Sequence, residues 1–315
     1  MVSTAVIMAT YNGAEFIEAQ LRSIQSQTRP ADYVIVRDDQ STDGTVSIVE
    51  SYIAKNNLIN WQIIVNEKNQ GWRLNFRQLI IDALVTGADY LFFSDHDDNW
   101  SPQKIERQLA CFEQVATADL ISSDYAIEIV GDGKLSGGIP YNFPKDEILS
   151  RYPFDMKKNS IYRLGWTNAI TRNFAQKIIE VWQEEIGDVA HDTIISMFAS
   201  NAGTGYNLNE ELGTHVRHGG NNSGSNYLSL SSLHSQHLAE LKRDLHYFQL
   251  TYDFAQKNQT IHKGEAEKMM KFYEKRFKNA SERRFFATIF QAILDRRLYF
   301  DVKGPIRDII FIFKK

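Results

Sequence analysis

The chain has 315 residues, of which 43% are hydrophobic, so it is long enough to bury a sizeable core. Its one cysteine, Cys111, excludes an internal disulfide framework and is expected in a helical core position. The start of the chain lacks the basic residues of a secretory signal, and no apolar run approaches the roughly 20 residues that cross a bilayer. We therefore expect a cytoplasmic protein, with a location at the inner face of the membrane as the alternative.

The formal net charge of −4 hides an uneven distribution. From Leu228 onward there are 17 Lys or Arg and 10 Asp or Glu, a balance of +7, whereas the residues before Leu228 have a balance of −11. The acidic part could hold a cation, and the basic part could meet an anionic surface or a neighbouring subunit. A solvated helical surface is the plainer explanation of the basic part. Nothing in the sequence indicates a nucleic acid partner.

Strand and helix patterns alternate over the first 115 residues. Apolar runs predict strands at residues 6–8, 33–36, 62–65 and 90–93. Helical spacing follows at residues 14–25, from a cap at Ser41 or Asp43 to Tyr52, at 75–84, and from Pro102 to Phe112. This order predicts an α/β fold whose mostly parallel sheet is covered by helices on both faces.

The rest of the chain has a different pattern. Residues 119–227 are mixed and loop-rich, with a glycine-rich stretch at 131–138 and a second helical run at 193–199. From Leu228 the pattern becomes helical, with apolar residues three or four apart that include Leu241, Phe248, Phe286 and Phe290. We predict a catalytic domain at residues 1–225 and a helical C-terminal domain at 226–315.

Three polar loops follow predicted strands, at residues 9–13, 38–44 and 95–100. Because ligands bind beyond the carboxyl ends of strands in such sheets, these loops should meet in space. The third loop contains Asp95, Asp97 and Asp98, and such an acidic cluster is costly unless a cation relieves the repulsion. Oxygen ligands suit Mg²⁺ or Mn²⁺. A solvated turn that caps the next helix is the alternative.

Other polar side chains are candidates for separate roles. Asp39 could accept a hydrogen bond from the N3–H of uracil or thymine, unless its loop only caps a helix. Asp192 is expected at a helix N-terminus, where it should stay ionised and could act as a general base, although most such aspartates only cap. His218 could complete a metal site, and His215 is a weaker candidate; both could equally be surface residues.

Several motifs together resemble family-2 glycosyltransferases, especially the bacterial rhamnosyltransferase-like branch. They are AVIMATYNG at 5–13, SIQSQT at 23–28, DDQSTDGT at 38–45 and SDHDDNWSPQK at 94–104. The resemblance covers roughly the first 220 residues. It implies a GT-A fold (Rossmann-like), a nucleotide diphosphate sugar donor and inversion at the anomeric carbon.

The resemblance also implies roles for individual residues. Donor-binding residues would be Tyr11, Asp39 and Asp95, and the ligand of Mn²⁺ or Mg²⁺ would be Asp97. To these we add Thr10 of the first polar loop as a donor-binding residue and His218 as a second metal ligand. Asp192 would be the catalytic base. His191 stands where the family usually has an acid, so its role is open. Trp166, Asn168 and His191 would lie on the acceptor side.

We expect a metal-dependent inverting hexosyltransferase that uses a UDP-hexose and a glycan acceptor on a protein or lipid carrier. The alternative is a dTDP-rhamnose-dependent rhamnosyltransferase of cell-surface polysaccharide assembly, because uracil and thymine present the same N3–H. A non-catalytic nucleotide-sugar-binding subunit and a nucleotidyltransferase are the other hypotheses, but residues 9–13 contain no Lys or Arg for a phosphate loop. We expect a homo-oligomer through the C-terminal helices, with a peripheral membrane contact as the alternative.

Overall fold

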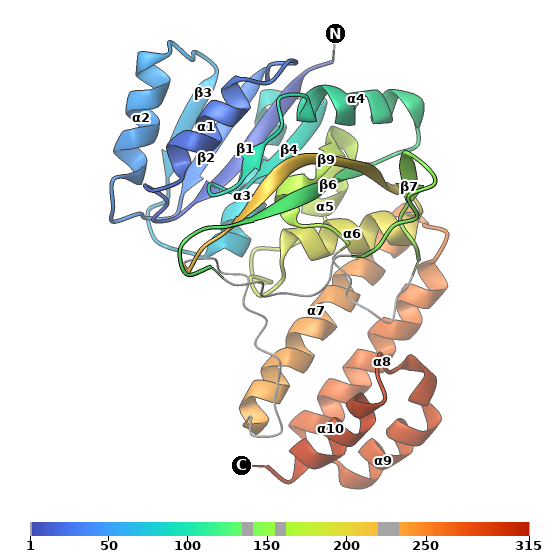
Figure 1. The fold of residues 1–315 in the computed structure, drawn as a ribbon. Coiled ribbons are helices and arrows are strands. Elements are labelled where there is room, and N and C mark those ends of the chain that lie inside the picture. Colours follow the sequence, from blue (N-terminus) through green and yellow to red (C-terminus); the bar gives the residue numbers. More distant parts are fainter. Residues whose placement is uncertain (1, 134–140, 155–161, 220–232, 315) are drawn as a thin grey trace.

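The computed structural model describes residues 2–133, 141–154, 162–219 and 233–314. Figure 1 shows an α/β part that carries the N-terminus and a group of helices that projects from it and carries the C-terminus. The predicted boundary near residues 223–225 lies outside the described residues, as does most of the glycine-rich stretch at 131–138. The division after residue 225 therefore stays a prediction.

The elements of the α/β part alternate along the chain. They are β1 (Thr4–Thr10), α1 (Ile17–Gln25), β2 (Tyr33–Asp38), α2 (Thr45–Lys55), β3 (Trp61–Val65), α3 (Trp72–Thr86), β4 (Tyr90–Ser94), β5 (Asn99–Trp100), α4 (Lys104–Gln114), β6 (Leu120–Ile129), β7 (Leu149–Arg151), η1 (Gly165–Thr167), β8 (Ala169–Thr171), α5 (Arg172–Ile179), α6 (His191–Ala202) and β9 (Gly205–Arg217). The helical part comprises α7 (His234–Asn258), α8 (Lys263–Ser281), α9 (Phe285–Leu294), η2 (Arg296–Leu298) and α10 (Lys303–Ile312). The strands and helices predicted for the first 115 residues are all present.

The predicted helix starts were wrong in detail: α1 begins at Ile17 rather than at residue 14, and α3 begins at Trp72 rather than at residue 75. The helix expected to open at Pro102 begins at Lys104, and the carbonyl of Pro102 accepts a hydrogen bond from Thr28 instead. The residue that caps α2 is Gly44, which makes no side-chain capping bond. Asp43 contributes from one position earlier, because its carboxylate accepts the Thr45 N–H at 3.0 Å.

The sheet combines a parallel half with a mixed half, and its strand order is β3-β2-β1-β4-β8-β6-β9-β5, with β7 paired to β9. Strands β3, β2, β1 and β4 are parallel neighbours, as predicted. Strand β8 then runs antiparallel to β4 and to β6. The carboxyl ends of the four parallel strands therefore lie along one edge, where the three polar loops begin.

Helices cover both faces of the sheet because the side chains of the central strand alternate between them. On one face, Ile7 of β1 joins a core that contains residues of α3, α5 and α6. On the other face, Val6 and Met8 join residues of α1, α2 and α4. Every residue of β1 is buried, which explains its continuous apolar run. The predicted GT-A-like arrangement of a sheet between two helical layers is confirmed.

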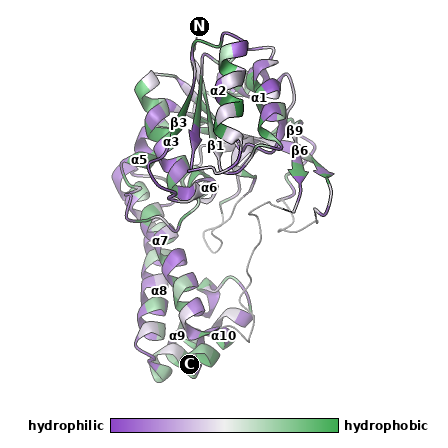
Figure 2. Ribbon diagram, turned by 90° about the vertical axis from the view of Figure 1, so that its left-hand side faces the viewer, coloured by the Kyte–Doolittle hydropathy of each residue, from purple (hydrophilic) through white to green (hydrophobic). Residues whose placement is uncertain are grey.

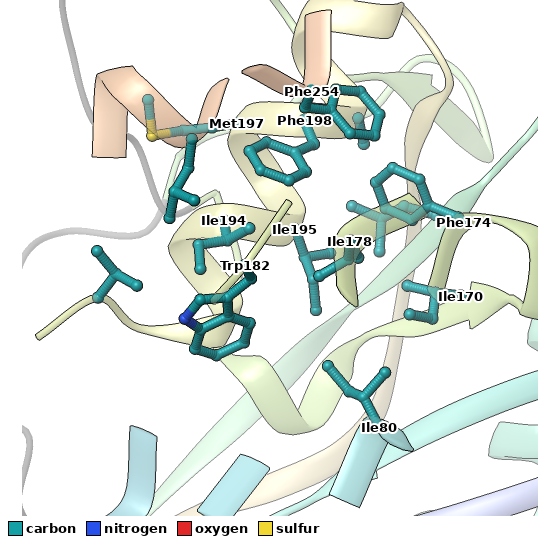
Figure 3. Packing of buried hydrophobic residues seen from close by; sticks show 14 of the residues in the cluster. Ile80, Ile170, Phe174, Ile178, Trp182, Ile194, Ile195, Met197, Phe198 and Phe254 are labelled. Atoms are coloured by element: carbon teal, nitrogen blue, oxygen red, sulfur yellow. The ribbon is translucent and has the colours of Figure 1, made fainter. Parts of the chain in front are cut away.

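The helical part shares a core with the α/β part rather than hanging from it. Phe254 of α7 stacks on Phe198 of α6 at 4.3 Å between ring centroids and meets the edge of Phe174 at 5.8 Å (Figure 3). Lys257 adds an ion pair to Glu180 at 2.9 Å. The C-terminal half of α7 is thus a component of the α/β core, and the N-terminal half extends away from it (Figure 1).

The apolar residues that predicted the C-terminal helices fall into two groups. Leu241, Phe248 and Phe272 are buried, whereas Phe286 and Phe290 are largely exposed. The helical periodicity was therefore predicted correctly, but only part of it closes a core. No helix in the described part of the chain has the length and apolar character needed to cross a bilayer.

Candidate active site

The loops after β1 and β2 are joined by hydrogen bonds at the edge of the sheet. The backbone N–H of Asn12 donates to the hydroxyl of Ser41 at 2.8 Å, and that of Gly13 donates to the hydroxyl of Thr45 at 2.8 Å. Asn12 has a left-handed backbone with φ of 49°, which asparagine tolerates better than most residues. Thr10 is buried beside this loop with no hydrogen-bond partner for its hydroxyl among the described residues. Tyr11 is exposed.

Asp39 organises a neighbouring loop that the sequence did not assign to the site. Its carboxylate accepts hydrogen bonds from the backbone of Gln70 at 3.0 Å and Gly71 at 2.7 Å, and from the side chain of Asn66 at 2.8 Å. These donors lie between β3 and α3. Asp39 is buried, so part of its accepting capacity holds this loop. Its role toward a nucleobase stays a prediction.

The acidic cluster lies just beyond β4. Burial there makes the charged forms of Asp95 and Asp98 unfavourable. Burial, together with the charges of Asp98 and Asp97, raises the pKa of Asp95 well above its ordinary value, and Asp192 adds to the effect. Burial and the charge of Asp97 do the same to the pKa of Asp98. The start of α6 lies close to the end of β4, because the ring of His191 stacks on Phe93 with centroids 5.3 Å apart, although nearly a hundred residues separate the two segments in sequence.

Two histidines at the end of β9 approach this cluster. The Nε2 of His218 lies 3.0 Å from Oδ2 of Asp97, and the Nδ1 of His215 lies 2.6 Å from Oδ1 of Asp98. The ring of His218 also stacks on Phe16 with centroids 4.2 Å apart. The two proposed ligands, Asp97 and His218, therefore face each other, while His215 supports the neighbouring acid.

These residues fit a cation that is shared with a bound diphosphate. Among the described side chains, no group of three His, Cys, Asp or Glu residues forms a complete metal site. Mg²⁺ and Mn²⁺ do not need one, because Mg²⁺ in phosphate sites takes one or two carboxylates from the protein and completes its shell with phosphate oxygens and water. The facing pair of Asp97 and His218 provides that partial set.

Asp192 lies in the first turn of α6, as predicted, and its carboxylate is more basic than an ordinary aspartate. Its Oδ1 accepts the backbone N–H of Thr193 at 2.7 Å. Burial raises its pKa to about 6, and the hydrogen bonds to Thr193 partly offset this rise, so the expected ionisation at neutral pH is retained. Asp192 is therefore ionised for most of the time at neutral pH, with a basicity that suits proton transfer.

The three residues predicted on the acceptor side are enclosed by protein. Trp166 and Asn168 have no exposed surface, and His191 is only 3% exposed. His191 stacks on Phe76 at 3.8 Å and packs against Gly165, where any side chain would collide with its ring. Burial lowers its pKa to about 3, so the ring is neutral. An acceptor could touch these side chains only if the protein around them moved, so the three assignments stay predictions.

Two residues near the site were missed as functional candidates. Lys104 is completely buried, its Nζ lies 5.1 Å from the ring centroid of Trp100, and burial lowers its pKa to about 7. Its position at the end of the acidic motif could have signalled it. Tyr247 of α7 accepts the backbone N–H of Ala190 at 2.8 Å through its hydroxyl, next to the start of α6. No local pattern indicates Tyr247, because the contact spans 57 residues.

Known proteins resemble this chain in sequence and in fold. A 105-residue segment is 41% identical to the dTDP-rhamnosyl transferase RfbG of Shigella flexneri, covering 33% of this chain and 36% of that relative. The EpsE protein of Bacillus subtilis, described as a putative glycosyltransferase, is 27% identical over 220 residues, which cover 66% of this chain and 70% of EpsE. The chain thus aligns with little more than a third of RfbG's length.

Among solved structures, residues 1–349 of Staphylococcus aureus TarS in complex with UDP superpose with a TM-score of 0.64. The superposition covers 99% of this chain and 89% of that one at 19% identity, a likeness of fold. The family model described as "Glycosyl transferase family 2" matches residues 5–181, more than half of the chain. The chain belongs to glycosyl transferase family 2.

Proposed function

We propose that the chain is an inverting glycosyltransferase that transfers a sugar from a nucleotide diphosphate donor to a hydroxyl of a glycan acceptor. The observation that carries the proposal is the convergence of two distant segments: Asp95 and Asp97 follow β4, and Asp192 lies at the start of α6. Its neighbour His191 stacks on Phe93 of β4 with ring centroids 5.3 Å apart. Family membership, which rests on residues 5–181, supports the same reaction class.

The donor would lie across the loops after β1, β2 and β4. Thr10, Tyr11 and Asp39 would contact the nucleoside, and Asp95 the ribose or the sugar. Thr10 supports this role with a buried hydroxyl that has no partner among the described residues. We keep a UDP-hexose as the favoured donor, with dTDP-rhamnose as the alternative; TarS, which shares the fold, was solved with UDP, and RfbG is described as a dTDP-rhamnosyl transferase.

Asp97 and His218 would hold Mn²⁺ or Mg²⁺ against the diphosphate. A divalent cation in such a site neutralises the charge that builds up on a departing diphosphate. The raised pKa values of Asp95 and Asp98 support the idea, because burial and mutual repulsion outweigh the opposing charges of Arg217 and Lys104 near Asp98. A bound cation would relieve this repulsion.

Asp192 would act as the general base. It would take the proton of the acceptor hydroxyl while the hydroxyl oxygen bonds to the anomeric carbon, and the bond from that carbon to the diphosphate breaks on the opposite side. One displacement of this kind inverts the configuration and leaves the nucleoside diphosphate as the second product. The pKa of about 6 leaves Asp192 both ionised and basic enough at neutral pH.

The test is to incubate the chain with Mn²⁺ and labelled UDP- and dTDP-hexoses and to identify the products. Release of nucleoside diphosphate, stopped by a chelator, supports the proposal. Release of pyrophosphate would indicate a nucleotidyltransferase. Binding of a donor without any turnover, even with a range of glycan acceptors, would indicate a non-catalytic subunit.

We also propose an acceptor on a protein or lipid carrier, a homo-oligomer, and a location at the inner face of the membrane. Light scattering of the purified chain tests the homo-oligomer that we predicted through the C-terminal helices. Acceptors linked to a protein and to a lipid, compared in the same transfer assay, distinguish the two kinds of carrier.

A further inference from the structure

One face of α9 is apolar and is left exposed by the part of the chain that the structure describes. Phe286, Phe290, Ile293 and Leu294 are each 62–75% exposed, and their spacing puts them on one side of the helix. The opposite side is anchored: Gln291 is buried, accepts a hydrogen bond from Asn279 of α8 at 2.9 Å and donates to the carbonyl of Phe272 at 3.2 Å. These hydrogen bonds to α8 fix the orientation of α9, so its apolar face points away from the helical core.

The neighbouring segments enlarge this face. We call residues 282–314 the tip. Beyond α9 it exposes Phe300, Val302, Ile306 and Phe313, by 56–71%. Among the described residues, every phenylalanine that is exposed by more than half lies in the tip. Figure 2 shows hydrophobic ribbon in α9 and α10 at the end of the molecule farthest from the N-terminus. Such a concentration of exposed aromatic residues marks an interaction surface.

The tip is also basic. From Glu282 to Lys314 it contains seven Lys or Arg and four Asp or Glu. Two of the acids are already paired with cations of α8: Asp295 with Lys275 at 3.0 Å and Asp308 with Arg276 at 2.8 Å. Exposed cations such as Arg297 and Lys303 lie in the same short segment as the exposed apolar residues. This combination is typical of elements that lie in the interface of an anionic membrane.

A second copy of the chain, which the sequence analysis favoured as the partner of the C-terminal helices, fits the tip less well than a membrane does. In a two-fold dimer the same patch meets itself, so the cations of one tip would face the identical cations of the other. Like charges at an interface oppose association. Anionic lipid headgroups offer the opposite charge and a hydrophobic layer for the aromatic rings at the same time.

The position of the tip relative to the candidate active site is consistent with docking. Tyr247 of α7 lies beside the start of α6, and His234 at the first turn of α7 bonds to the carbonyl of Phe311 in the tip. The 13 residues between them span about 20 Å at the helical rise of 1.5 Å per residue. In Figure 1 the helical part projects from the side of the α/β part toward which β1 and β4 run. The tip therefore extends beyond the α/β part on the side where the polar loops lie, at a distance from the acidic cluster.

We propose that the tip docks the chain on an anionic lipid bilayer, with the apolar face of α9 in the interface. The chain would bind peripherally, since no described helix can span a bilayer. This inference does not depend on the proposed transfer reaction, because it concerns a surface far from the acidic cluster. If the reaction is as proposed, docking would favour acceptors that are held at the membrane.

The experiment is sedimentation of the full chain with vesicles of phosphatidylcholine containing about 30% phosphatidylglycerol, compared with phosphatidylcholine alone. We expect binding to the anionic vesicles only. Phe286→Ser with Phe290→Ser should lower the partition coefficient at least about tenfold, and Arg297→Ala with Lys303→Ala should lower it by a similar factor. The matched control is Ile59→Ser with Val85→Ser, which removes two exposed apolar side chains of the α/β part and should change nothing.

Donor turnover and light scattering of each variant complete the test. Turnover of the donor in solution should be the same in the wild type and the tip variants. The turnover assay therefore tests the proposed reaction, and the sedimentation assay tests docking, independently of each other. Absence of wild-type binding to the anionic vesicles would overturn the proposal, as would equal binding to neutral ones. A wild-type dimer that Phe286→Ser with Phe290→Ser converts to a monomer would also overturn it, because the patch would then be a contact between copies.

Discussion

The acidic cluster after β4 and the Arg276–Asp308 pair in the helical part both bury charged side chains, but they meet the cost of burial differently. In the acidic cluster, burial and the charges of neighbouring acids hold the pKa values of Asp95 and Asp98 well above the ordinary value. In the helical part, the guanidinium of Arg276 donates two hydrogen bonds of 2.8 Å to Asp308.

The helical pair is also completed by a third group, because the Tyr299 hydroxyl donates to Asp308 at 2.9 Å. Burial by itself raises the pKa of Asp308, but the charge of Arg276 and the hydrogen bonds hold it well below its usual range. We infer that the helical cluster stabilises the fold. The acidic cluster lowers the free energy of unfolding, and a bound cation would offset this loss. The following predictions test this difference, beginning with the largest effect.

Asp192→Asn should lower the rate of transfer by about 10²–10⁴-fold, because the amide cannot accept the acceptor's proton. Donor affinity should be unchanged, since the donor would be held by the loops after β1, β2 and β4. Transfer kinetics and calorimetric titration with the donor measure the two quantities, with Asp146→Asn in an exposed loop as the control. Joint loss of donor affinity and transfer would make Asp192 a binding residue.

Asp97→Asn should lower turnover by about 10²–10³-fold through the loss of electrostatic stabilisation. Its thermal unfolding midpoint should not fall, because the substitution removes a charge that repels Asp95 and Asp98. Turnover assays with Mn²⁺ and thermal unfolding test both parts. Full activity of the wild type in excess chelator would contradict the metal assignment.

Arg276→Met should lower stability and leave the reaction intact, the reverse of the effect expected for Asp97→Asn. Removing the guanidinium leaves Asp308 buried without its partner, which should lower the free energy of unfolding by about 3–5 kcal/mol. The KM for the donor should be unchanged in the fraction that stays folded. Denaturant titration measures the effect, and Lys278→Met at an exposed position of α8 is the control. If Arg276→Met unfolded no more easily than this control, the helical cluster would not be the stabilising one.

The pH dependence of the reaction should follow Asp192. A base with a pKa of about 6 is protonated below that pH, so kcat/KM should fall about tenfold per pH unit below 6 and level off above it. The acid limb should disappear in Asp192→Asn. A limb near pH 4 would mean that burial does not raise the pKa of the base in the working enzyme.

Tyr247→Phe should have the smallest effect on the reaction. Tyr247 links the helical part to the α/β part, because its hydroxyl on α7 bonds to the backbone before α6. The substitution removes the acceptor of the Ala190 N–H, worth about 1 kcal/mol, and so should lower kcat about fivefold without changing the KM for the donor. Tyr252→Phe, on the same helix, serves as the control. A change in donor KM alone would place Tyr247 outside the positioning of Asp192.

The order of elements over the first 115 residues and the edge at which the polar loops meet could be predicted from the sequence. Period-2 and period-3.6 patterns are local, and the carboxyl ends of parallel strands must share one edge. The acidic motif pointed to Asp97, and a histidine after it suggested His218 as its partner. The short distance between them required the antiparallel pairing of β5, which follows Asp97, with β9, which precedes His218.

Other properties were decided only by the tertiary structure. The sequence predicted that the C-terminal chain is helical, but the packing of α8 determined that Gln291 faces inward and Phe290 outward. Likewise, the sequence placed His191 beside Asp192, yet stacking on Phe76 buries the histidine while its neighbour stays near Asp95. The physical reason is the same in both cases: periodicity shows which residues share a face, and only the packing of distant elements decides whether that face is covered.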